Sequence, residues 1–212
     1  MPLDPDLFLA FLASALLISL IPGPDMVFVV ATGFRHGPRG GAAAAVGVSG
    51  GMLMHTAAAV AGLSALIQSS APAFEAIRWA GIAYLLWLAL SALRGDGPGQ
   101  IQDRMSSTGS ERSLLRVGRQ GAVTNLLNPK VILFFLAFLP QFVDRDQGSV
   151  GLQLLALGIA FAAVGLIVDA AIGIASGRLG RRLAASERFS RALDRLAAVV
   201  FVGLAVRLVT DR

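Results

Sequence analysis

The sequence predicts an all-α protein that crosses a membrane with six helices. Two observations support this prediction. The chain of 212 residues is 55% hydrophobic and only 15% charged, whereas an ordinary soluble domain carries about 25% charged residues. The apolar residues also gather in runs of roughly 20 residues, the length that a helix needs to cross the hydrocarbon core of a bilayer.

Six apolar segments of this length follow one another along the chain. They cover residues 7–32, 41–67, 74–93, 120–142, 150–176 and 192–209. The stretch between the third and fourth segments is rich in Gly, Ser and charged residues, which is typical of a flexible linker. We therefore expect one integral membrane domain over residues 1–212, with three helices in residues 1–94, a cytoplasmic linker in 95–119 and three helices in 120–212.

The arginines predict how these helices are oriented. Arginine accounts for 17 of the 18 basic residues. Twelve arginines fall in the first loop, the linker and the loop before the last segment, against two, Arg145 and Arg212, on the opposite side. Because loops rich in Lys and Arg stay in the cytoplasm, we expect a multi-pass protein of the bacterial inner membrane with both termini outside. This pattern explains the net charge of +5 better than a nucleic-acid partner would.

Two of the predicted spans are interrupted in the middle by helix-breaking residues. The first contains SLIPGPDMVFV, with Pro22, Gly23 and Pro24, and the fourth contains TNLLNPKVILFF, with Pro129. Because each half has an odd number of spans, the second half would insert upside down relative to the first. The two breaks then occupy corresponding positions of an inverted repeat, which points to the binding site of a transporter.

Each break has the sequence of a helix that starts again inside the membrane. Asn128 is a strong N-cap and Gly23 a fair one, and each precedes a proline, which is favoured at the first helical position. The free N–H groups at such a restart favour an anion, for example a substrate carboxylate. Irregular backbone at that depth is tolerated where it is buried in protein or lines a cavity. We therefore expect both restarts to lie at a central site near the middle of the membrane.

The residues just inside the two restarts carry opposite charges. Asp25 is favourable at a helix N-terminus, whereas Lys130 is unfavourable there. A lysine against the dipole and within a bilayer needs a compensating partner, and Asp25 occupies the corresponding position. We expect the two to pair and to bind substrate or couple its transport. The alternative is that Asp25 only caps its helix and that Lys130 extends to the membrane interface.

Three more polar residues lie within predicted spans. Asp169 has apolar neighbours on both sides in the fifth span, and His55 lies in the second. Ionisable groups at this depth are associated with proton relays, so either residue is a candidate carrier of a coupling proton. Asn125 shares a helical face with Asn128, so it either lines the cavity or bridges helices. For His55, the alternative role is a hydrogen-bonded packing residue.

The second span is also rich in glycine. Gly47 and Gly51 have the spacing that lets membrane helices approach closely, and such faces would permit a homodimer. Residues 47–50, GVSG, also match a motif of rhomboid-type intramembrane serine proteases. On one helix, however, His55 would lie about 600° around and roughly 9 Å along the axis from Ser49, too far to act as its base. We expect no enzymatic activity, no cofactor and no metal site.

Four stretches of the sequence form a pattern that is shared with a known family. They are the PGPD break, VGVSGGMLMH, WAGIAYLLWLALSALR and NLLNPKVILFFLAFLPQFVD. Together they resemble the LysE/RhtB family of amino-acid exporters over the whole chain except the linker. The functional positions that this resemblance implies are Pro22, Gly23, Pro24, Asp25, Asn125, Asn128, Pro129 and Lys130. Many members have an acidic residue shortly before the histidine of the second span, where this chain has Gly51 and Met52.

The resemblance implies a proton-coupled exporter of neutral or cationic amino acids. The substrate carboxylate would lie near Lys130 and its amino group near Asp25 or Asp169, while the two halves rock against each other. The partners would be the amino-acid substrate, protons and the lipid bilayer. Two other functions stay open. One is an exporter or channel for another small solute or a metal ion, and the other is a membrane scaffold without transport activity.

Overall fold

The structure is a computed structural model that describes residues 5–63, 114–144 and 146–179, with isolated helical positions between residues 75 and 90 and between 195 and 209. Every regular element within these ranges is helical. Most of the predicted linker and of the third and sixth spans lies outside the described residues. The six-span count and the inverted repeat therefore stay predictions.

The first predicted span is divided into two helices, as the sequence predicts. Helix α1 covers Pro5–Leu20 and helix α2 covers Pro24–Ala58. Proline explains the break, because Pro22 and Pro24 lack the N–H groups that would continue the hydrogen bonding of α1. Gly23 is the N-cap residue of α2, with extended backbone angles, and Pro24 follows at the first helical position.

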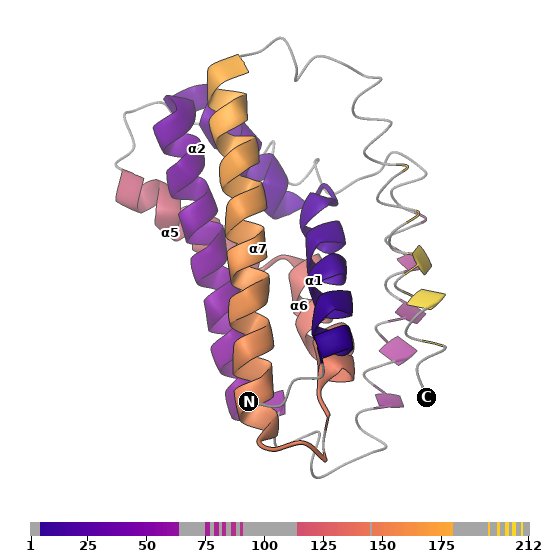
Figure 1. Ribbon diagram of the computed structural model, residues 1–212. Helices are drawn as coiled ribbons and strands as arrows, with labels where there is room; N and C mark the ends of the chain where they lie inside the picture. The colour runs from indigo at the N-terminus through magenta and orange to yellow at the C-terminus, as the bar shows by residue number, and fades with distance from the viewer. Residues whose placement is uncertain are drawn as a thin grey trace.

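Helix α2 turns back on itself at Gly37, where φ is 69°, a conformation that glycine adopts without strain. Gly33, before the turn, and Gly41, after it, both lie against Gly173 of helix α7, which covers Val150–Leu179. In Figure 1, the first part of α2 continues upward from the top of α1 and passes behind α7, and the second part descends beside α7. A tight turn therefore takes the place of the loop that the sequence predicts between the first two spans.

The fourth predicted span is broken and bent. It contains helix α5 (Leu114–Leu126), helix α6 (Pro129–Leu133), the π-helix η3 (Phe134–Phe138) and the 3-10 helix η4 (Leu139–Phe142). The direction changes by 53° between α5 and the segment from Pro129 onward. Helix α5 begins earlier than the predicted start at residue 120, within the predicted linker. A search for long apolar runs misses this start because the first turns of α5 are amphipathic, with Val117 buried.

Several of these helices are long and apolar enough to cross a membrane. By length and composition, within the described ranges, they are Pro24–Gly62, which includes the turn at Gly37, and Val150–Arg178, and the bent pair of α5 with Pro129–Phe142 would make a third span. The pattern of burial agrees, since Leu9 and Ile167 are 63% and 70% exposed. The buried set, in contrast, includes the charged or amide residues Asp25, Asn125, Asn128, Lys130, Gln153 and Asp169. Apolar side chains on the outside and polar ones inside indicate a protein that is inserted in lipid.

Small residues hold the helices of this bundle close together. A Cβ atom at Gly51 would come within 2.8 Å of Asn125, and Gly47 lies directly against Gly118. The close approach predicted for the second span is thus confirmed at Gly47 and Gly51, where α2 packs on α5. At Gly50, in contrast, a Cβ atom would meet nothing within 4 Å.

Aromatic packing fixes the segment after the second break against α1. The ring of Phe11 in α1 lies 6.0 Å from that of Phe134 and 5.2 Å from that of Phe142. Phe134 also stacks on Phe161 of α7, with 4.4 Å between ring centroids. Because these rings are buried, they hold α6 beside the end of α1, which brings the two breaks together.

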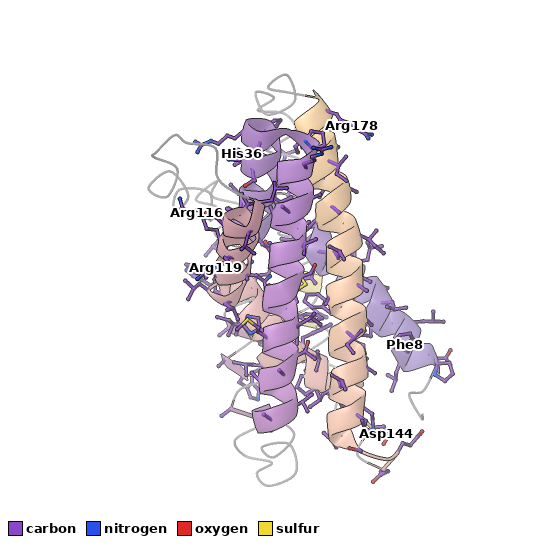
Figure 2. The ribbon with its side chains drawn as sticks, turned by 90° about the vertical axis from the view of Figure 1, so that its left-hand side faces the viewer. Phe8, His36, Arg116, Arg119, Asp144 and Arg178 are labelled. Atoms are coloured by element: carbon purple, nitrogen blue, oxygen red, sulfur yellow. The ribbon has the colours of Figure 1, made fainter. Side chains whose placement is uncertain are left out.

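The charged ends of the bundle differ. Figure 2 shows His36 and Arg178 at one end and Asp144 at the other. Gly177 lies against Gly37 and Pro38, so the turn of α2 and the end of α7 share the end that carries His36 and Arg178.

Candidate functional site

The two breaks meet at a buried pair of opposite charges. Lys130 Nζ lies 3.5 Å from Asp25 Oδ1, and the two residues are 6% and 3% exposed. The structure therefore brings together the pair that the sequence predicts. The Lys130 side chain points into the bundle, where its Nζ contacts Asp25 of α2 and the end of α1.

Lys130 has two further partners that the sequence does not name. Its Nζ donates hydrogen bonds to the carbonyl oxygens of Ile18, at 3.2 Å, and Ile21, at 3.0 Å. These carbonyls lie at the C-terminal end of α1, where the helix dipole favours a cation. The ammonium thus faces the favourable end of another helix, although it sits at the unfavourable end of its own.

Proline makes one of these carbonyls available. In a continuous helix, the carbonyl of Ile18 would accept from the N–H four residues later, and that residue is Pro22, which has none. Ile21, the residue after α1, donates its N–H to this carbonyl at 3.3 Å. A carbonyl oxygen has two lone pairs, so Ile18 can accept from Lys130 as well. Pro22 therefore leaves an acceptor that Lys130 uses.

Asp25 is held at the N-terminus of α2 with glycine beside it. Its Oδ1 accepts a hydrogen bond from Met26 N–H at 2.9 Å. A Cβ atom at Gly23 would lie 3.0 Å from Asp25 Oδ1 and 3.2 Å from Lys130 Nζ. Glycine at this position leaves the space that the ion pair occupies.

The second break is capped as its sequence predicts. Asn128 Oδ1 accepts a hydrogen bond from Lys130 N–H at 3.1 Å, and Pro129 is the first residue of α6. Asn125 and Asn128 are both fully buried. The Nδ2 atoms of both residues and Oδ1 of Asn125 have no hydrogen-bond partner among the described residues. Unpaired buried amides of this kind are rare in stable cores, so they mark this break as a candidate binding region.

Asp169 is the third charged residue of the site. Two contacts show that helix α7 runs parallel to the first part of α2: Gly173 lies against Val29, and Gly177 lies against Gly37. One turn back along each helix, Asp169 comes beside Asp25. Asp169 is 3% exposed and interacts electrostatically with both Asp25 and Lys130. The site therefore combines two carboxylates with one ammonium, and a single proton on either carboxylate makes it neutral.

His55 lies at the second break and does not contact the ion pair. Its Nε2 is 3.4 Å from the carbonyl oxygen of Asn125, and its ring stacks on Phe135 with 5.4 Å between centroids. These contacts agree with a hydrogen-bonded packing residue. Among the described residues, no group of three or more His, Asp or Glu side chains is arranged to hold a metal ion.

Comparison with known proteins identifies the family. The sequence profile of the LysE type translocators matches residues 16–212. The chain belongs to the LysE type translocator family. This membership indicates a transporter rather than an enzyme.

Three similar proteins each align with most of the chain. A membrane protein of Vibrio cholerae serotype O1, named as uncharacterized, is 32% identical over 99% of this chain and 100% of its own length. A leucine efflux protein of Klebsiella pneumoniae is 30% identical over 96% of this chain and 94% of its own. A homoserine/homoserine lactone efflux protein of Salmonella typhi is 33% identical over 83% and 81%. No solved structure matches the chain.

Proposed function

We propose that this LysE type translocator exports amino acids or close derivatives across the bacterial inner membrane in exchange for protons. The observation that carries the proposal is the buried cluster of Asp25, Lys130 and Asp169 at the junction of two broken helices. Charged residues at this depth are costly and are associated with substrate and ion pathways. The efflux proteins of Klebsiella and Salmonella, with leucine and homoserine in their names, support the substrate class.

The charges of the cluster match those of an amino-acid zwitterion. The substrate carboxylate would bind at Lys130, and its amino group would bind near Asp25 or Asp169. Asp169 would carry the coupling proton, because no hydrogen bond or ion pair to it is formed within the described ranges. All of these groups come from one chain, so the proposal does not require the homodimer that the glycine-rich faces would permit.

The orientation and the transport cycle follow from the same features. The end that carries His36 and Arg178 would face the cytoplasm, and both termini would lie outside, as we expect from the distribution of arginines in the sequence. The breaks at Pro24 and Pro129 would correspond in two inverted halves, whose rocking would expose the charge cluster to each side in turn.

Transport in membrane vesicles tests this proposal. We expect leucine or homoserine to move only when a pH gradient is imposed, and movement of other solutes or of none would favour the alternative exporter or the scaffold. In preloaded cells, Asp25→Asn and Lys130→Ala should each lower export at least about tenfold, because each removes one charge of the site. Ser176→Ala is the control, since its hydroxyl only bonds Ile172 within α7. Unchanged export in both charge variants would overturn the site assignment.

A further inference from the structure

Lys130 shows what kind of group the end of α1 binds. Its ammonium has three acceptors around it: the carbonyl oxygens of Ile18 and Ile21 and the carboxylate of Asp25. An ammonium has three N–H donors, so this set is complete for one primary ammonium. The three acceptors contact Lys130 through its Nζ, and their chemistry is the same for any other primary ammonium.

We infer that these three acceptors form the subsite for the ammonium group of the substrate, and that this group replaces the ammonium of Lys130 there. The inference rests on the proposed function, to which it adds the two carbonyls and the exchange. Lys130 is then a tethered equivalent of the substrate amine. Its carbonyl contacts are at hydrogen-bonding distance, but the 3.5 Å to Asp25 exceeds the roughly 2.8 Å of a strong charge-assisted bond. The contact with Asp25 is thus the longest of the three contacts of Nζ.

Exchange with a zwitterion conserves the charge pairing in the site. The substrate ammonium takes the acceptors of Lys130, and the displaced Lys130 ammonium pairs with the substrate carboxylate. An amine without a carboxylate would leave Lys130 displaced beside a second cation, in a buried environment where like charges repel strongly. Lys130 therefore selects ligands that carry both charges. Glycine at position 23 leaves room for the Lys130 side chain, because a Cβ atom there would be 3.3 Å from Lys130 Cε.

The decisive variant is Lys130→Met, which removes the tethered ammonium and keeps a side chain of similar length. The purified protein is heated with propylammonium chloride, tetramethylammonium chloride or sodium chloride at equal concentration. In Lys130→Met, propylammonium should raise the Tm by about 3 °C or more over the other salts, because only propylammonium has N–H donors for the three acceptors. In the wild-type protein, the three salts should act alike.

Ser14→Ala is the matched control. Ser14 lies in α1, one turn before Ile18, and its hydroxyl donates to the carbonyl of Ala10 instead of to the subsite. The variant should therefore respond as the wild type does. Equal responses of Lys130→Met to all three salts would overturn the inference. If Lys130→Met is not recovered folded, Asp25→Asn/Lys130→Met removes both charges and keeps the two carbonyls. That protein should still respond to propylammonium, although less, and a lack of response would overturn the inference equally.

The salt test separates this inference from the proposed function, because it requires no knowledge of the substrate. A positive salt response in a protein that exports no amino acid would keep the ammonium subsite and reject the proposed function. Amino-acid export by the wild type, with no salt response in the variants, would reject the subsite alone.

Discussion

The two helix breaks have similar sequences, but different groups complete them. At the second break, Asn128 caps α6 with its own side chain, and the charged residue that follows is Lys130. At the first break, Gly23 provides no side-chain cap, and two carbonyls of α1 are left for a partner from elsewhere. That partner is Lys130, from the second break. The first break supplies acceptors and the second supplies the donor, so neither is complete without the other.

This difference means that the pair is not symmetric in its chemistry. Asp25 accepts from the N–H of its own helix and lies at a favourable dipole end. Lys130 is unfavourable in its own helix and is stabilised almost entirely by α1 and α2. A variant in which the two charged residues are exchanged would therefore still have an ion pair, but it should not have a working site.

The largest effect is expected for this exchange, Asp25→Lys/Lys130→Asp. A carboxylate at position 130 would face the carbonyl oxygens of Ile18 and Ile21 without a proton to donate, and a buried charge without a suitable partner costs about 3–5 kcal/mol. We expect a large fall in Tm and no export, measured by thermal unfolding and by efflux from preloaded cells. Export near the wild-type level would show that the carbonyl contacts are unimportant.

A smaller effect is expected for Pro22→Ala at the first break. The new N–H would compete with Lys130 for the carbonyl of Ile18 and extend α1 by hydrogen bonding. A hydrogen bond to a charged group is worth about 1.5–3 kcal/mol, so export should fall roughly tenfold while the protein stays folded. Pro140→Ala in η4 is the control for loss of a proline. Equal export in Pro22→Ala and the wild type would contradict the role assigned to Pro22.

The smallest effect is expected for the cap of the second break. Asn128→Ala removes the acceptor for Lys130 N–H and should lower the free energy of unfolding by about 1 kcal/mol, or the Tm by about 2–4 °C. Asn128→Ser retains a capping oxygen and should recover most of that loss. If both variants lose export equally while their Tm values differ, the unpaired Nδ2 of Asn128 is required for transport, and the cap alone does not explain the residue.

The breaks and the ion pair could be predicted from the sequence because they depend on local chemistry. Pro24 and Pro129 fix where helices restart, and Asn128 is a strong cap wherever a helix begins. Lys130 within an apolar span requires a partner of opposite charge, and few residues qualify. These arguments use neighbours in the chain or the cost of a buried charge, so they do not depend on the packing of distant helices.

The carbonyl acceptors and the position of Asp169 could not be predicted in the same way. Every residue has a main-chain carbonyl, so the sequence does not distinguish those of Ile18 and Ile21. The only sequence feature that indicates a free acceptor here is that Pro22 lacks an N–H. Asp169 reaches Asp25 because Gly173 packs on α2, a contact between residues far apart in the chain. The contact of His55 with Asn125 likewise depends on how α2 packs on α5.

Lys130 is also the single lysine of the chain, so its ammonium is the only side-chain amine. Amine-directed chemistry at internal positions therefore reports on this site alone, without mutation of other residues. A reagent that cannot cross the membrane reaches this nitrogen only when the site is open to the side where the reagent is added. The labelling rates from the two sides of a vesicle thus measure how the protein divides its time between the two openings.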